Sequence, residues 1–139
     1  MTIDYKNDIS VQDYNFLRKS VGWNEININQ AKVGISNSLY LITANNMNKT
    51  IGLVRVVGDG GYIAVIVDVI VLPEYQGKGI GKSLIQKIME LINNDLKEGE
   101  SVFVNLMAAK GKEPFYRQFG FIDRPNEIMG CGMTQWIRK

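Results

Sequence analysis

Two segments of the chain repeat their apolar residues at the three-to-four spacing of an amphipathic helix. The first covers residues 10–22, where a serine that can cap a helix opens the segment and a glycine closes it. The second covers residues 79–93, where Ile and Leu recur on one face. Shorter helices are predicted at 29–36 and 112–119, so four helices are expected in all.

Runs rich in β-branched residues lie between these helices and are bounded by polar or glycine-rich turns. The run 62–72 is the longest, and its almost unbroken apolar character predicts a central strand buried on both faces, ended by Pro73. The other predicted strands are 39–44 and 50–57, which form an antiparallel hairpin across a turn at 45–49, then 102–107, and two final strands at Phe121 and 133–137. Together these elements predict an α+β (mixed α/β) fold in a single domain, residues 1–139.

Composition excludes several classes of protein. The 139 residues carry a net charge of only +2, which suggests neither a nucleic-acid nor a membrane partner. One cysteine, Cys131, and no histidine exclude an internal disulfide, the usual zinc sites, and Ser-His or Cys-His catalytic pairs, so we predict no metal. The polar start lacks a signal-peptide core and no run approaches the ~20 apolar residues of a membrane span, so a cytoplasmic location is expected.

The segment 73–83 reads Pro-Glu-Tyr-Gln-Gly-Lys-Gly-Ile-Gly-Lys-Ser between the long strand and the helix after it. Glycines permit a tight turn, and the unpaired N–H groups at a helix N-terminus attract an anion, so a diphosphate is the natural ligand. The P-loop pattern fails because it needs glycine at Gln76, and the dinucleotide pattern fails because it needs glycine at Lys82. What fits is R/Q-x-x-G-x-G/A, beginning at Gln76 and ending at Gly81.

This match and the later segment 114–121, Pro-Phe-Tyr-Arg-Gln-Phe-Gly-Phe, resemble the pyrophosphate loop and the F-Y-x-x-x-G-F motif of GNAT N-acetyltransferases. The resemblance covers about residues 49–133 and is nearest to serotonin (arylalkylamine) N-acetyltransferases of the plant and cyanobacterial type. It implies a mostly antiparallel central sheet, splayed at 62–72 and flanked by helices. It also implies acetyl-CoA as co-substrate and direct transfer of acetyl to a primary amine.

The resemblance also implies catalytic roles. Tyr116 occupies the place of the acid that protonates the departing thiolate, which is chemically reasonable because a thiol has a pKa of ~8.5 and a tyrosine of ~10; a core tyrosine is the alternative. Asp68 is the one carboxylate in the run 62–72 and is a candidate base, because burial raises the pKa of a carboxyl group. The alternative is a structural carboxylate that binds backbone N–H groups or Arg55. Family relay histidines match Val65 and Val67, which are expected on the opposite face of the strand from Asp68.

The implied coenzyme A site uses backbone N–H groups of the strand end and of the glycine loop, with two lysines near the phosphates and a lysine and a serine capping the helix start. The strand N–H groups act as an oxyanion hole and hold the pantetheine arm. The full set is Val69, Val71, Gln76, Gly77, Lys78, Gly79, Ile80, Gly81, Lys82 and Ser83. One departure from the family is Ala109, where many members carry an asparagine.

Residues that contact the acceptor are harder to identify. Trp23 and Glu25 follow the first helix, and Glu25 could attract a cationic amine; a packing or surface role is the alternative for both. The leading hypothesis is acetylation of a small-molecule amine, arylalkylamine or polyamine-like. The alternatives are a protein lysine or N-terminal acetyltransferase and a non-catalytic acyl-CoA-binding sensor. Because GNAT proteins often dimerise, the resemblance leaves a homodimer open.

Overall fold

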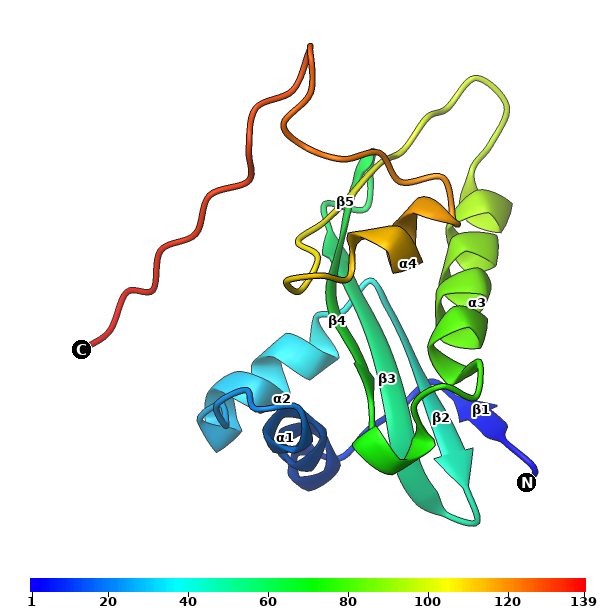
Figure 1. The fold of residues 1–139 in the computed structure, drawn as a ribbon, viewed down its shortest axis with the longest axis vertical. Helices are drawn as coiled ribbons and strands as arrows, with labels where there is room; N and C mark the ends of the chain where they lie inside the picture. Colours follow the sequence, from blue (N-terminus) through cyan, green and yellow to red (C-terminus); the bar gives the residue numbers. More distant parts are fainter. The chain divides into compact units, whose positions relative to one another are not determined.

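The structure is a computed structural model that describes all of residues 1–139. Its contacts divide the chain into two compact units, Met1–Leu106 and Met107–Lys139. The first unit holds a five-stranded sheet and three helices (Figure 1). The predicted α+β class is confirmed, whereas the boundaries 1–139 of a single domain stay a prediction.

The elements follow one another in this order: β1 (Asp4–Lys6), α1 (Val11–Ser20), α2 (Ile28–Ser36), β2 (Tyr40–Asn46), β3 (Lys49–Gly58), β4 (Ile63–Val71), a 3-10 turn (Pro73–Tyr75), α3 (Ile80–Asp95), β5 (Phe103–Leu106) and α4 (Glu113–Arg117). The strands lie in the order β1-β2-β3-β4-β5, and every neighbouring pair is antiparallel except β4 and β5. A parallel pair needs a crossover connection, and α3 supplies it. The short strand β1 was not predicted.

Side chains in the two preceding loops cap the first two helices. The hydroxyl of Ser10 accepts a hydrogen bond from the N–H of Asp13 at 3.0 Å, so the predicted helix start is confirmed. The side chain of Asn27 accepts from the N–H groups of Asn29 and Gln30 at 3.0 and 3.2 Å. Both helices therefore begin where a side chain satisfies backbone N–H groups that the helix itself leaves unpaired.

The first hairpin is tighter than the sequence suggests. We predicted a turn over 45–49, but β2 and β3 are joined by Met47 and Asn48 alone, with φ of 48° and 67°. Positive φ at both central residues is the type I′ geometry whose twist matches that of paired strands. Polar residues next to the turn thus continue the strands, which is why the polar run was mistaken for a longer loop.

Helices cover the sheet on both faces. A Cβ on Gly52 of β3 would lie 3.2 Å from Leu84 Cδ1, so this side of β3 packs against α3. Arg55, three residues later, points the other way and donates to the Gly34 carbonyl of α2. Figure 1 shows α3 on one side of the strands and α1 with α2 on the other. The core therefore has two layers, one between the sheet and α3 and one between the sheet and α1 with α2.

The strand β4 differs from its prediction. It was expected to be buried on both faces, but buried and partly exposed residues alternate along it, and Val67 is 38% exposed. Arg55 pairs with Asp68 while Val56 pairs with Ile66, so Val67 has no partner on β3 and forms a β-bulge. An extra residue in one strand cannot be read from apolar periodicity, because the pattern of residue types does not change.

The second unit contains α4, which was predicted as 112–119 and is shorter. Gly120, at φ 90°, follows its last turn, as the sequence suggested. The two predicted final strands, at Phe121 and 133–137, are wrong: no strand follows β5. A strand needs a neighbour for its N–H and C=O groups, and apolar residues alone do not provide one. Trp136 and Ile137 are accordingly exposed.

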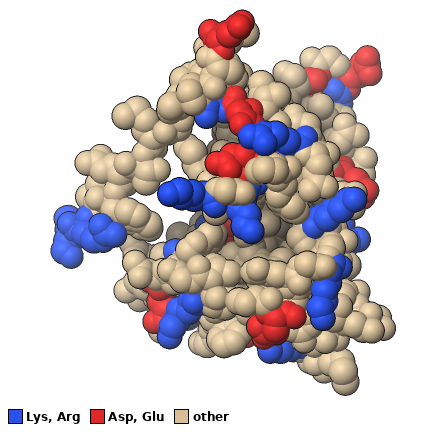
Figure 2. Space-filling view, viewed as in Figure 1, with Lys and Arg blue, Asp and Glu red and all other residues tan.

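Charges of both signs are mixed over the surface drawn in Figure 2, in keeping with the net charge of +2. No helix is both long enough and apolar enough to cross a lipid bilayer. The structure offers no group of three or more Asp, Glu or Cys side chains arranged to hold a metal ion.

Candidate functional site

The glycine-rich loop leads into α3 with its backbone exposed. Gly77 and Gly79 have φ of 77° and 81°, a conformation that side chains other than glycine rarely adopt. Gly79 is the N-cap of α3 and has no side chain to satisfy the first turn. The helix can therefore offer the N–H groups of Ile80, Gly81 and Lys82 to an anion.

The surroundings of this loop also fit a polyanion. A Cβ on Gly77 or Gly79 would meet nothing within 4 Å, so the loop surface is open. Lys78 and Lys82 are exposed cations beside it, and the Lys78 ammonium lies 5.7 Å from the centre of the Tyr75 ring. These features fit the diphosphate of coenzyme A, which this loop would hold through N–H groups and the two lysines.

One residue of the predicted coenzyme A set does not act as expected. Ser83 was expected to cap the helix start, but the α3 cap makes no side-chain hydrogen bond. The backbone N–H of Ser83 instead donates to the Gly79 carbonyl at 3.0 Å, as the first bond of the helix. Ser83 lies one residue too far along the helix, so its N–H is not available to a ligand.

The edge of β4 that faces β5 is paired over only part of its length. The parallel ladder joins Ile63–Ile66 to Phe103–Leu106 and stops there. No strand pairs with β4 on that edge from Val67 onward. The sheet is therefore splayed within the run 62–72, as the resemblance implied.

The direction of the free N–H groups follows from one hydrogen bond. The N–H of Leu72 donates to the Ile51 carbonyl of β3 at 2.9 Å. Because successive N–H groups of a strand point to opposite edges, those of Val71 and Val69 point away from β3, toward the unpaired edge. The two residues predicted to bind a thioester carbonyl and a pantetheine arm thus have N–H groups on the edge where no strand competes for them.

The side chain of Gln76 joins this strand edge to the glycine loop. Its Nε2 donates to the Val71 carbonyl at 2.9 Å. Sequence reasoning had assigned Gln76 a backbone role only. The glutamine of the R/Q-x-x-G-x-G/A pattern therefore has a structural task here, which is to fix the loop against the end of β4.

Asp68 is almost fully buried and is surrounded by donors. Its Oδ2 accepts hydrogen bonds from the Tyr14 hydroxyl at 2.7 Å and from Arg55 Nε at 2.8 Å. A second guanidinium, that of Arg18, lies 3.6 Å from Oδ1. The contact with Arg55 is the structural alternative considered from the sequence. The catalytic role of Asp68 stays a prediction.

Tyr14 and Arg18 were not predicted as partners of Asp68. A signal was present: the two residues stand four positions apart on the first predicted helix, and a buried carboxylate needs donors. Burial, and then the charge of Asp68, raise the pKa of Tyr14, so this hydroxyl stays protonated and donates. The prediction that Val65 lies on the opposite face of the sheet from Asp68 is wrong. Because of the bulge, both side chains lie on the same face.

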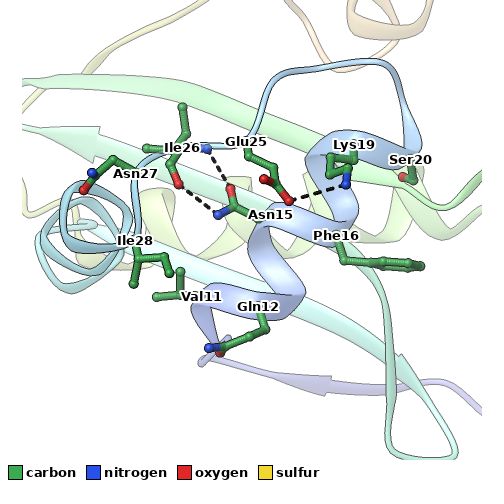
Figure 3. Close-up of a pocket in the computed structure, with 10 residues that line it drawn as sticks. All are labelled: Val11, Gln12, Asn15, Phe16, Lys19, Ser20, Glu25, Ile26, Asn27 and Ile28. Atoms are coloured by element: carbon green, nitrogen blue, oxygen red, sulfur yellow. Dashed lines mark hydrogen bonds and ion pairs between the residues drawn. The ribbon is translucent and has the colours of Figure 1, made fainter.

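The structure separates the two predicted acceptor residues. Trp23 stacks on Arg18, with the guanidinium carbon 5.4 Å from the ring centre, and so lies next to the Asp68 cluster. Glu25 instead pairs with Lys19 at 3.5 Å and lines a groove along the outer side of α1 (Figure 3). That groove lies on the side of α1 opposite to Tyr14, so Glu25 does not face the unpaired edge of β4 at Val69 and Val71.

Tyr116 lies on α4 in the second unit. Its ring makes edge-to-face contacts with Phe115 at 5.0 Å and with Phe121 at 6.2 Å. Burial raises the pKa of the Tyr116 hydroxyl, so the phenol keeps its proton at neutral pH. The loop that follows is fixed by two hydrogen bonds from Arg117 to the Asp123 carboxylate, at 2.8 and 2.6 Å.

Comparison with known proteins identifies the class that these features define. Residues 36–123 match the model of the acetyltransferase (GNAT) domain. The chain therefore belongs to the GNAT family of acetyltransferases and is an acyltransferase. An open mixed sheet, a glycine-rich loop before a helix and a splayed strand edge are the corresponding features of its structure.

Individual relatives agree with this assignment. The Staphylococcus aureus protein SA2161, of unknown function and described as a probable acetyltransferase, is 32% identical and superposes with a TM-score of 0.84 over 96% of this chain and 100% of its own. The uncharacterized N-acetyltransferase ycf52 of Pyropia yezoensis is 31% identical over 88% of this chain and 71% of its own length. The histone acetyltransferase TAP1 of Glycine max is 30% identical over 88% of this chain and 56% of its own length.

Proposed function

We propose that this chain is an acetyl-CoA-dependent N-acetyltransferase that transfers acetyl directly to a primary amine of a small molecule, arylalkylamine or polyamine-like. The observation that supports it best is the combination of two open sets of backbone N–H groups. One set belongs to the uncapped start of α3, and the other to Val69 and Val71 on the unpaired edge of β4. Gln76 holds the two sets together.

In this proposal acetyl-CoA supplies a thioester whose acetyl group is transferred. The N–H groups of Val69 and Val71 bind the carbonyl oxygen and the pantetheine arm, and donors aimed at developing charge accelerate such a step by about 10²–10³ each. The amine nitrogen forms the new C–N bond as the C–S bond breaks. Tyr116 is our candidate for the acid that gives its proton to the thiolate.

The acceptor amine must lose a proton, and Asp68 remains the proposed base. Its Oδ2 already accepts from Tyr14 and Arg55 and its Oδ1 faces the Arg18 guanidinium, so a water molecule would have to relay the proton. The test is the pH profile of kcat/KM for Asp68→Asn. A base role predicts that the rising limb of the profile disappears, and a purely structural role predicts a lower curve with its limb intact.

A protein acetyltransferase is the second candidate, because a relative named as a histone acetyltransferase covers most of this chain at 30% identity. The experiment is a free-thiol release assay with acetyl-CoA and a panel of amines: tryptamine, serotonin, spermidine, amino sugars and lysine peptides. The proposal predicts release with one small-molecule class. Release with peptides alone supports the second candidate, and acetyl-CoA binding without release indicates a sensor.

The acid is tested in the same assay with Tyr116→Phe, which removes the hydroxyl and keeps the aromatic contacts. General acid catalysis typically contributes about 10²–10⁴-fold, so kcat should fall by at least that lower factor. Unchanged kcat would remove Tyr116 from the mechanism. Independence from nucleic acid and membrane, a homodimer and a cytoplasmic location stay predictions, of which gel filtration tests the dimer directly.

A further inference from the structure

The bulge in β4 determines which N–H groups face the unpaired edge. Before the bulge, the Tyr62 carbonyl accepts from the Phe103 N–H, so the even-numbered residues face β5. After it, Leu72 faces β3, so the odd-numbered residues face the β5 side. If Val67 were paired in a regular, unbulged strand, alternation would turn the N–H groups of Val69 and Val71 back toward β3.

A buried ion pair closes the ladder where the bulge occurs. Arg55 and Asp68 are the last register partners before the irregularity, and their side chains meet across the two strands at 2.8 Å. Both are largely shielded from water, with side chains 14% and 4% exposed. The Nη1 of Arg55 donates to the Gly34 carbonyl at 3.0 Å and to the Ser38 hydroxyl at 3.4 Å.

The other contacts of Asp68 differ from this one in origin. Tyr14 and Arg18 both come from α1 and approach the carboxylate from the helix above the sheet. They fix α1 on the sheet. Among the side chains that contact Asp68, only Arg55 comes from the neighbouring strand, so Arg55 is the one that can support the strand register at the bulge.

We propose that Arg55 is a positioning residue for acyl transfer: by pairing with Asp68 it fixes the bulge at Val67, and the bulge aims the N–H groups of Val69 and Val71 at the reacting carbonyl. This inference rests on the proposed function. It assigns Arg55 no contact with either substrate. It also explains a buried carboxylate in an apolar strand without requiring that carboxylate to carry protons.

The test compares Arg55→Gln with Arg18→Gln. Each change removes one guanidinium from Asp68, but only the first removes the cross-strand bond. Arg55→Gln should lower kcat by 10-fold or more and raise the Kd for acetyl-CoA by a smaller factor, because the glycine loop stays intact and only the contacts along the strand edge are disturbed. Arg18→Gln should keep kcat within 3-fold. In nitrogen-15 NMR spectra, the amide resonances of Val67–Val69 should move in Arg55→Gln and hardly in Arg18→Gln.

A folded Arg55→Gln with unchanged kcat and unchanged amide resonances would overturn the inference. If that variant fails to fold, the double variant Arg55→Met with Asp68→Asn replaces it, since it leaves no buried carboxylate unpaired and keeps an acceptor for Tyr14. Because this double variant also removes the proposed base, only its amide resonances are compared, against those of Asp68→Asn alone: further shifts at Val67–Val69 are expected, and resonances equal to those of Asp68→Asn would overturn the inference. If the wild type transfers no acetyl group, the proposed function fails, and the amide resonances alone decide whether Arg55 holds the bulge.

Discussion

Two glycines with the same backbone conformation give a sharp test of the coenzyme A loop. Gly79 at the start of α3 has φ of 81°, and Gly99 in the loop after α3 has φ of 83°. A Cβ at either position would meet nothing within 4 Å. Replacement by alanine therefore introduces backbone strain alone, without a steric clash, and only one of the two positions belongs to the proposed ligand site.

The expected magnitude follows from that strain. A non-glycine residue in the left-handed region costs about 1–2 kcal/mol. At about 2–4 °C per kcal/mol for chains slightly larger than this one, both Gly79→Ala and Gly99→Ala should lower Tm by about 2–8 °C. Nothing packs against the loop at Gly79, so the alanine variant relieves part of this strain in the free protein; binding must restore that part, which lowers acetyl-CoA affinity by up to about 5–30-fold. Gly99→Ala should leave that affinity unchanged.

Thermal unfolding and isothermal titration calorimetry with acetyl-CoA measure the two effects separately. The reasoning is refuted if Gly79→Ala binds as tightly as the wild type, or if Gly99→Ala loses as much affinity. In the first case the loop is not where the ligand binds. In the second the loss reflects general destabilisation.

Three further predictions concern stability. Asn27→Ala removes the α2 cap and should cost about 1 kcal/mol in urea unfolding, whereas Asn29→Ala, whose side chain makes no hydrogen bond, should cost much less; equal effects would contradict the cap. Gly52→Val places atoms against Leu84 and the Ile70 carbonyl and should cost about 1–3 kcal/mol, and a neutral result would show that the sheet and α3 pack less closely. Burial raises the pKa of Tyr116 in the folded state, so its contribution to stability is complete below about pH 10 and is lost as pH rises through the higher folded value. Unfolding at pH 8 and 10.5 should thus show a smaller loss in Tyr116→Phe than in the wild type, and identical losses would contradict the burial of this hydroxyl.

Much of the first unit could be predicted because its signals are local. Amphipathic spacing predicts α1 and α3, and the glycine pattern at Gln76 predicts an open helix start. The type I′ turn at Met47 and the bulge at Val67 could not be predicted, because each depends on how one strand pairs with another. For the same reason the sequence identified Asp68 as unusual but not its donors Tyr14 and Arg18.

In the second unit the sequence predicted strands that do not form. The run 133–137 has the composition of a strand, yet a strand forms only where a neighbour accepts its backbone hydrogen bonds. The two residues predicted to contact the acceptor lie apart for a different reason. Trp23 and Glu25 are close in sequence, but after the turn that follows α1, Trp23 packs on Arg18 whereas Glu25 pairs with Lys19. Proximity along the chain does not determine which side of a helix a following residue occupies.

The most direct test of the central claim is acetyl transfer by the purified wild-type chain, followed by mass spectrometry of the products. With acetyl-CoA and an equimolar mixture of the amines named above, the account predicts that one small-molecule amine class gains an acetyl group as free coenzyme A appears in equal amount. If the chain neither binds acetyl-CoA nor transfers acetyl to any of these amines, the central claim is contradicted.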